Sequence, residues 1–199
     1  MNFLAHLHIA THCQSSLMGN LLGDFVKGNP NQKYPKNIVD GIYLHRFVDR
    51  YTDTHPLVLE QKGVFPSQLR RFSPIALDMF WDHCLAKHWD QFYPDSLRGF
   101  LEQCQKEWHS VNYFVPEKFT HTSQLMWKNQ WLLSYQDIDN IVFALQRMSL
   151  RRERFSPLAE CGQVLIKHYD DLKRIFFRLY PEVLEQAKIF SQDQLVMKD

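Results

Sequence analysis

The sequence predicts an all-α protein, a single-domain helical bundle, from three observations. Glycine is sparse, with 7 in 199 residues, and no window alternates apolar and polar residues between hairpin turns as strands do. Ser73-Pro74 and Ser156-Pro157 each place a capping hydroxyl before a proline, a common way for helices to begin. From residue 165 to residue 179, apolar residues recur at three- and four-residue steps, which indicates one face of a long amphipathic helix.

Seven helices are expected, and prolines and glycines set several of their ends. Gly28-Asn29-Pro30 is a stop signal for the helix before it. His55-Pro56 ends another helix, because the residue before a proline is pushed out of helical geometry. Residues 56–72 are expected to form a connector with room for one short helix. The expected helices cover residues 2–12, 15–27, 37–54, 74–92, 95–113, 120–150 with a break, and 157–188.

Length and composition favour one domain. A chain of 199 residues with 45% hydrophobic and 14% aromatic residues can bury one sizeable core but is short for two. We expect a helical domain over residues 1–190 and a frayed C-terminal tail over residues 191–199. The mean hydropathy is -0.38, and no stretch approaches the roughly 18 consecutive apolar residues of a membrane span. We therefore expect a soluble protein with no membrane partner.

Charge and cysteine content narrow the partners and the compartment. With 23 basic and 22 acidic residues, the overall charge gives no attraction to nucleic acid, so a charged partner must meet a local patch. The four cysteines are scattered without a CxxC pair, which argues against a zinc knuckle or a disulfide framework. We expect core-filling thiols in a protein of the reducing cytoplasm.

Residues with metal-binding chemistry are concentrated in the first half of the chain. Seven of the ten histidines lie in the first 90 residues. His45, Asp49 and Asp53 follow one another at four-residue steps, so they share one face of a helix. Asp78 and Asp82 repeat this spacing among apolar neighbours, where an unpaired carboxylate is costly to bury. Such donors suit Mn²⁺, Mg²⁺, Fe or Zn²⁺ in a hydrolytic site.

The alternative for these residues is a set of ordinary polar contacts. His–Asp pairs are common on solvated helix faces, and Asp78 has two arginines, Arg46 and Arg71, as candidate partners. Asp24, in the stretch GNLLGDFVKG, is either an exposed acid or part of a largely buried face. The sequence pattern alone leaves both interpretations open.

Two histidines in the opening stretch MNFLAHLH fall on different sides of the expected helix. His6 borders the apolar stripe formed by Phe3 and Leu7, whereas His8 lies about 200° away. The two imidazoles should therefore not bind one metal together. His6 is either a satisfied core residue or a ligand directed toward Asp24, and His8 is expected to be a supporting polar contact.

Basic residues form two small clusters near helix ends. One is Arg70-Arg71 and the other comprises Arg151, Arg152 and Arg154. They are either solvated loop residues or binding groups for phosphate and for an acidic partner.

Several stretches, in order along the chain, resemble the bacterial acyl carrier protein phosphodiesterase family, also called holo-acyl carrier protein hydrolases. They are MNFLAHLHIA, GNLLGDFVKGNP, GIYLHRFVDRYTD, SPIALDMFWDHCLAKHW and QWLLSYQDIDNI, followed by SLRRER. The resemblance implies an all-helical enzyme distantly related to the HD phosphohydrolases that uses a divalent metal, typically Mn²⁺, with Mg²⁺ or Fe as alternatives. Its substrate would be holo-acyl carrier protein, from whose serine it removes 4'-phosphopantetheine.

The resemblance also assigns residues. It implies metal ligands at His6, Asp24, His45, Asp49, Asp78 and Asp82. Our hypothesis is that Asp24, with Asp78 or Asp82 and an imidazole from His6 or His45, holds the metal, which activates water for attack at phosphorus. In it Arg46, Arg151 or Arg152 stabilises the phosphoryl charge, and His45 or His83 gives a proton to the serine oxygen.

Acyl carrier proteins are strongly acidic, so Arg70, Arg71, Arg151 and Arg152 are expected to bind the substrate protein in a salt-sensitive way. Two alternatives to this function remain. One is a metal-dependent phosphohydrolase of a nucleotide or another small phosphoester. The other is a non-catalytic helical module that binds the carrier protein, or a haem or iron ligand through its histidines.

Overall fold

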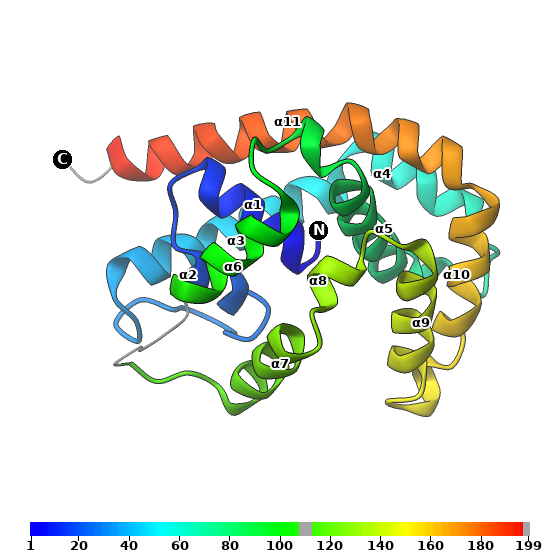
Figure 1. Cartoon of the computed structure of the whole chain (residues 1–199), viewed down its shortest axis with the longest axis horizontal. Coiled ribbons are helices and arrows are strands. Elements are labelled where there is room, and N and C mark those ends of the chain that lie inside the picture. Colours follow the sequence, from blue (N-terminus) through cyan, green and yellow to red (C-terminus); the bar gives the residue numbers. More distant parts are fainter. Residues whose placement is uncertain (108–112, 197–199) are drawn as a thin grey trace.

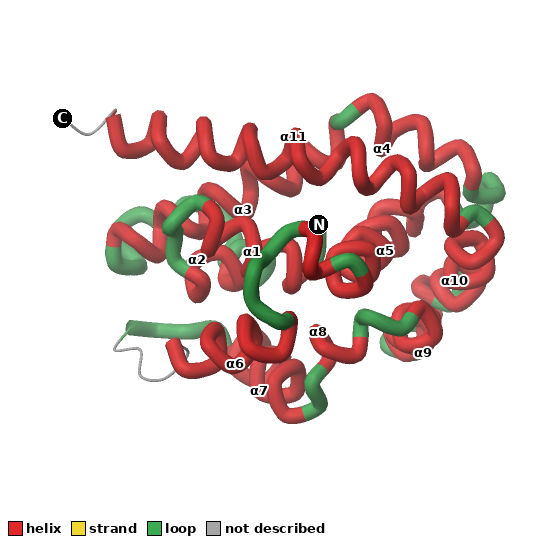
Figure 2. The backbone as a smooth tube through the Cα atoms, turned by 45° about the horizontal axis from the view of Figure 1, so that its top comes forward, coloured by secondary structure: helices red, strands yellow, loops and turns green. Residues whose placement is uncertain are grey.

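The computed structural model of the chain describes residues 1–107 and 113–196, and every regular element among them is a helix (Figure 2). The all-α prediction is confirmed. The helices are α1 (Phe3–His12), α2 (Leu17–Leu22), α3 (Lys36–Thr54), α4 (Pro56–Gln61), α5 (Ser73–Lys87), α6 (Leu97–Glu107), α7 (Glu117–Lys128), α8 (Trp131–Ser134), α9 (Ile138–Ser149), α10 (Leu158–Lys167) and α11 (Tyr169–Val196), with 3-10 turns η1 (Lys62–Val64), η2 (Arg70–Phe72), η3 (Trp89–Gln91) and η4 (Glu153–Phe155).

Helix α1 is the centre of the bundle. It contacts α2, α3, α5 and α11, and its residues from Leu4 to Ala10 are all buried. Helix α11 runs along one edge of the molecule, and α9 and α10 form the end opposite α2 (Figure 1). The apolar opening stretch of the sequence is therefore a core helix, and its two histidines are carried into the interior.

Several helix boundaries differ from those expected. The single helix expected over residues 157–188 is divided at His168, whose ψ of 20° interrupts the helical path between α10 and α11. The helix expected over 120–150 with one break has two, which divide it into α7, α8 and α9, and Gln130 lies in the left-handed region at φ 50° between the first two. Helix α2 ends at Leu22, and turns carry the chain on to Val26. The Ser73 hydroxyl donates to the Arg70 carbonyl and does not cap α5.

Other boundaries are confirmed. Helix α3 ends at Thr54, one residue before His55-Pro56, and Pro56 then opens α4 at its first position.

The four cysteines are free thiols, of which Cys84, Cys104 and Cys161 are buried. One end differs from the expectation, because helix α11 continues to Val196 and so includes residues 191–196 of the expected frayed tail, while residues 197–199 lie outside the described residues. In the described part of the chain, none of the helices combines the length and apolarity needed to span a bilayer.

Helices α2 and α3 cross at a pair of glycines. A Cβ atom on Gly41 would lie 2.9 Å from the Gly19 Cα atom and 3.0 Å from the Asn20 backbone nitrogen. A Cβ atom on Gly19 would lie 2.6 Å from the Ile38 carbonyl oxygen. Because these neighbours are backbone atoms, they cannot move aside as a flexible side chain would. The crossing fixes how closely the chain after α2 approaches α3.

We expect Gly41→Ala to lower the free energy of unfolding by about 1–3 kcal/mol, because the added methyl group forces two tightly packed backbones apart. Urea unfolding followed by circular dichroism measures this loss. Gly63→Ala is the matched control, since a Cβ atom there meets nothing within 4 Å. Equal free energies of unfolding for the two variants would show that the close approach of α2 and α3 at Gly41 does not limit the stability of the fold.

Candidate functional site

Two helices bring three potential metal ligands together. His6 lies on α1, and His45 and Asp49 lie one turn apart on α3. Asp49 accepts from both imidazoles, with Oδ1 3.0 Å from His6 Nε2 and Oδ2 3.0 Å from His45 Nε2. The two rings stack at a centroid distance of 3.8 Å. One ligand atom from each residue lies within 4.8 Å of the other two, which makes a compact donor set of two nitrogens and one oxygen.

Asp24 joins this cluster from the turn that follows α2. Its Oδ1 atom lies 3.4 Å from His45 Nε2. Gly23 provides the room, because a Cβ atom there would lie 2.2 Å from the His45 ring. Arg46 holds the next part of the loop by donating to the carbonyls of Val26 at 2.5 Å and Gly28 at 2.8 Å. Arg46, which was predicted to bind the phosphoryl group, is thus bonded to the loop that carries Asp24.

Asp78 of α5 approaches the cluster through the α-amino group of Met1. That nitrogen lies 2.7 Å from Asp78 Oδ1 and 3.6 Å from Asp49 Oδ1. Burial lowers the pKa of the amino group, but the charges of Asp78 and Asp49 outweigh burial and raise it to about 10. The amino group is therefore a cation between two carboxylates. Figure 1 places the N-terminus in the middle of the bundle, beside α5.

The cluster is buried on its imidazole side and open on its carboxylate side. The side chains of His6 and His45 are 0% and 2% exposed, whereas those of Asp24, Asp49 and Asp78 are 48%, 35% and 30% exposed. The Nδ1 atoms of both histidines are buried without a hydrogen-bond partner. Solvent and substrate can therefore reach the acidic groups, while the protein interior holds the rings.

The two imidazoles differ in protonation. Burial and the nearby positive charge of His45 together lower the pKa of His6 to about 4, although Asp49 opposes this shift. Burial also acts to lower the pKa of His45, but hydrogen bonds and charges from Asp24 and Asp49 raise it to about 9. Burial acts to raise the pKa of Asp49, yet the two imidazoles lower it well below its usual range. In the metal-free protein, protonated His45 supplies the positive charge that these carboxylates require.

Asp82 lies outside the cluster and bonds to the beginning of α1. Its two oxygens accept from the backbone nitrogens of Leu4 at 2.8 Å, Ala5 at 3.1 Å and Asn2 at 3.3 Å. Burial raises the pKa of this carboxyl to about 7, although the amide hydrogen bonds oppose the shift. Asn2, the N-cap residue of α1, makes no side-chain cap, so Asp82 satisfies the free amides from a distant helix. The sequence spacing that placed Asp82 beside Asp78 gave no signal of this bonding.

His83 and His8 make polar contacts away from the cluster. His83 Nδ1 lies 2.8 Å from the Tyr135 carbonyl and Nε2 lies 2.8 Å from the Tyr169 hydroxyl, so both ring nitrogens are occupied. Of the two histidines predicted as proton donors, only His45 lies in the cluster. His8 bonds to the Tyr180 hydroxyl at 2.7 Å, as expected of a supporting contact.

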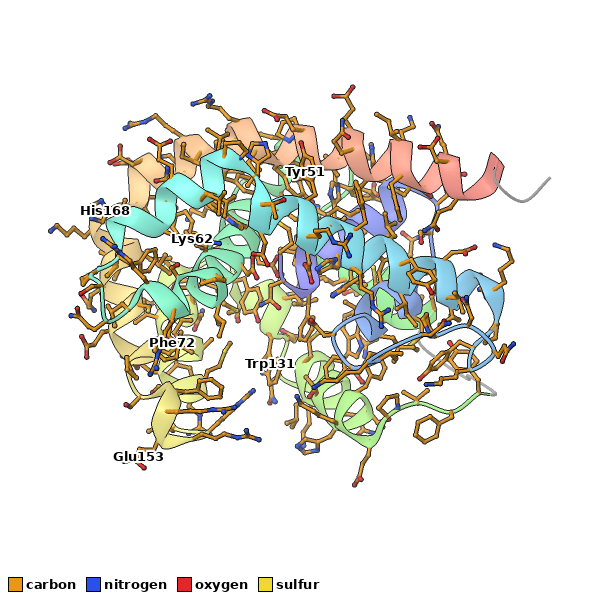
Figure 3. All side chains as sticks on the ribbon, turned by 180° about the vertical axis from the view of Figure 1, so that it is seen from behind. Tyr51, Lys62, Phe72, Trp131, Glu153 and His168 are labelled. Carbon is orange, nitrogen blue, oxygen red and sulfur yellow. The ribbon has the colours of Figure 1, made fainter. Side chains whose placement is uncertain are left out.

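The two basic clusters of the sequence meet in space. Arg71 donates to the Arg154 carbonyl at 3.3 Å, and the rings of Phe72 and Phe155 lie edge to face at 6.4 Å. Figure 3 shows Phe72 and the turn that carries Glu153 at the same end of the molecule. The exposed residues gathered here, named the arginine patch below, are Arg70, Arg71, Arg151, Arg152 and Arg154.

Comparison with known proteins gives consistent matches. A family model described as acyl carrier protein phosphodiesterase matches residues 1–183. A protein of that name from Yersinia pestis is 44% identical over 189 residues, which is 94% of this chain and 98% of that protein. The proteins of the same name from Photorhabdus laumondii and Escherichia coli O6:H1 are each 42% identical, over 94% of this chain and 96% and 97% of their own lengths. No solved structure matches.

We expect the metal-free protein to lose stability as the pH rises from 6.5 to about 9. Because the pKa of His45 is raised from 6.5 to about 9 by folding, its charged form stabilises the fold fully below pH 6.5, and this stabilisation disappears through pH 9. The loss is about 1.4 kcal/mol for each unit of pKa shift. Urea unfolding across this pH range measures it.

His45→Gln should remove most of this alkaline decline and should also reduce the decline on the acid side, because the charge of His45 helps to lower the pKa of His6. The acid side depends on His6, whose lowered pKa makes the fold lose stability as the pH falls from 6.5 to about 4. Parallel pH profiles of the wild type and the variant would show that the charge of His45 does not stabilise the fold.

Proposed function

Because the chain belongs to the acyl carrier protein phosphodiesterase family, we propose that it hydrolyses the phosphodiester that links 4'-phosphopantetheine to the serine of holo-acyl carrier protein, leaving the apo-protein. Members of this family are phosphoric diester hydrolases, and the chain is an enzyme of that class. The observation that carries the proposal is the solvent-open cluster of His6, His45 and Asp49, with Asp24 at its edge.

We propose that His6, His45, Asp49 and Asp24 hold a divalent cation. Two imidazole nitrogens and two carboxylates suit Mn²⁺ or Fe²⁺ better than Mg²⁺, which prefers oxygen ligands. The excess of carboxylates over cations around Asp49 also supports a bound positive charge. When bound, such an ion polarises a phosphoryl oxygen and makes a water molecule more acidic.

The chain's own residues would position this chemistry. Asp49 bonds to both imidazoles, so it fixes the orientation of the two rings with respect to each other. Arg46 fixes the loop that carries Asp24 and acts as a positioning residue. The partly exposed carboxylates of Asp24 and Asp78 would face the side from which the diester and the attacking water arrive. The proposed localisation is cytoplasmic, in keeping with four cysteines that are all free thiols.

Cleavage of the substrate protein tests this function. When metal-stripped protein is incubated with holo-acyl carrier protein and Mn²⁺, the carrier protein should lose the mass of one phosphopantetheine group. Intact-protein mass spectrometry measures this loss. Asp49→Asn should lower turnover by about 100-fold or more, because it removes a ligand and the partner of both imidazoles. Asp53→Asn, one turn further along α3, is the matched control and should keep activity.

Other outcomes would overturn the proposal. Cleavage of small phosphodiesters alone would identify a phosphohydrolase with another substrate. Binding of holo-acyl carrier protein without any mass loss would identify a non-catalytic binding module. Turnover in the presence of a chelator and without added cation would contradict the proposal that these residues hold a catalytic metal, but it would not contradict the proposed reaction.

We propose that the arginine patch binds the acidic carrier protein beside the site. Its residues Arg70 and Arg71 immediately precede α5, and Asp78 lies five residues after the first residue of that helix, about 7.5 Å along the axis. Guanidinium groups at the beginning of the helix that carries Asp78 suit a partner whose modified serine enters the site. The bond of Arg71 to the Arg154 carbonyl brings the second group of arginines to the same end of α5 and supports docking there.

The double variant Arg71→Glu with Arg154→Glu should raise KM for holo-acyl carrier protein by about tenfold and leave kcat nearly unchanged, since these two residues bind the partner and do not touch the reacting atoms. The wild-type rate at low substrate should fall with added salt. Arg98→Glu, an exposed arginine on α6, is the control. A salt-independent rate would contradict docking through the patch.

A further inference from the structure

The α-amino group of Met1 is a buried cation at the edge of the metal-ligand cluster. Its nitrogen lies 2.7 Å from Asp78 Oδ1 and 3.6 Å from Asp49 Oδ1. The charges of these two carboxylates outweigh the effect of burial and raise the pKa of the amino group to about 10. The group is therefore an ammonium ion at neutral pH, and it stands next to the carboxylates whether or not a metal is bound.

Two sets of contacts prevent the amino group from turning away from the carboxylates. The Met1 side chain is 0% exposed and packs into the hydrophobic core. The next backbone amide, that of Asn2, donates to Asp82, which also accepts from two amides in the first turn of α1. Because Asp78 and Asp82 lie one turn apart on α5, the helix that anchors the beginning of α1 also presents the partner of the amino group.

Asp78 has this amino group as its cation in place of an arginine. The sequence offered Arg46 and Arg71 as partners, but Arg46 donates to the loop after α2 and Arg71 donates to the Arg154 carbonyl. Burial raises the pKa of the Asp78 carboxyl, and the amino group opposes this shift. The ammonium group therefore favours the ionised form of Asp78 and holds one of its oxygens.

The charges at the cluster balance only when this ammonium group is counted. Asp24, Asp49 and Asp78 supply three negative charges on the open side. A divalent cation would supply two positive charges and displace the proton of His45. The α-ammonium group supplies the third positive charge. Without it, one negative charge would remain where a phosphodiester anion must approach.

We propose that the α-ammonium group of Met1 is a positioning group of the site, which holds Asp78 and balances its charge, and that an acyl group on this nitrogen lowers the activity. The inference rests on the proposed function. A formyl group, which bacterial synthesis places on an initiator methionine, converts the amine into a neutral amide. The Asp78 carboxylate would then lose its cation and be free to turn toward a metal ion. A blocked chain should therefore bind a divalent cation more tightly and a phosphodiester less well.

The test compares the full chain with a free α-amino group and the chain that keeps its formyl group after expression with a deformylase inhibitor. Intact-protein mass spectrometry identifies each form, and circular dichroism shows that each is folded. Formylation should lower the Kd for Mn²⁺, measured by calorimetry, and lower kcat/KM for holo-acyl carrier protein, each by about tenfold, because a positive charge is lost beside the ligands. Two residues, Gly-Ser, added before Met1 should act in the same direction. The same two residues added after Asp199 are the matched control and should change neither value.

Asp78→Asn in the formylated chain distinguishes the charge from damage to the fold. This variant removes one negative charge and so compensates for the lost ammonium group. The Kd for Mn²⁺ should return to within about threefold of its value in the unblocked wild type, as expected of two groups that act on each other. Damage to the fold would weaken Mn²⁺ binding in the formylated chain, and Asp78→Asn would not reverse it.

The outcomes separate this inference from the proposed function. Equal Kd values for Mn²⁺ and equal turnover by the free and formylated chains would overturn the inference and leave the phosphodiesterase function intact. Weaker Mn²⁺ binding by the formylated chain, without recovery in Asp78→Asn, would also overturn it. The expected changes in Kd without turnover by either chain would support the role of the ammonium charge and refute the reaction. Absence of Mn²⁺ binding by every form would overturn the inference and the proposed metal ligands together.

Discussion

The hydrogen bonding of the first turn of α1 by Asp82 is the interaction on which the site depends. A helix buried from Leu4 to Ala10 cannot leave its first amides without acceptors, because water does not reach them. The Asp82 carboxylate accepts from three of these amides and comes from α5, far along the sequence. This contact fixes α1 against α5 and so fixes where His6 enters the cluster. It also places the α-amino group beside Asp78 on the same face of α5.

The second constraint is the crossing of α2 and α3 at their glycines. His6 reaches the cluster from α1, whereas Asp24 reaches it only because the chain after α2 passes close to His45. A side chain at Gly19 or Gly41 would separate the two backbones, and one at Gly23 would collide with the His45 ring. Three glycines of a glycine-poor chain therefore lie where the site requires close approach.

The sequence allowed those parts of the site to be predicted that lie within one helix. His45 and Asp49 share a helical turn, and the proline after His55 sets the end of that helix, so both features follow from spacing alone. The opening stretch also indicated that His6 and His8 point to different sides, and they bond to Asp49 and Tyr180 respectively. Contacts between helices were not accessible in this way. Asp82 has the same spacing from Asp78 as Asp49 has from His45, yet its partners are backbone amides that no side-chain pattern reveals.

The distribution of charge around the site links its structure to its substrate. A phosphodiester is an anion. The open side of the cluster, formed by the partly exposed carboxylates of Asp24, Asp49 and Asp78, repels it unless cations offset their charge. In the metal-free protein, His45 and the α-amino group supply two such charges, but both lie on the buried side. The arginine patch, whose residues Arg70 and Arg71 lie in the turn before α5, is exposed and lies outside the cluster. A divalent cation among the imidazoles would displace the proton of His45 and neutralise the charge that remains on the three carboxylates, so that they would no longer repel the diester.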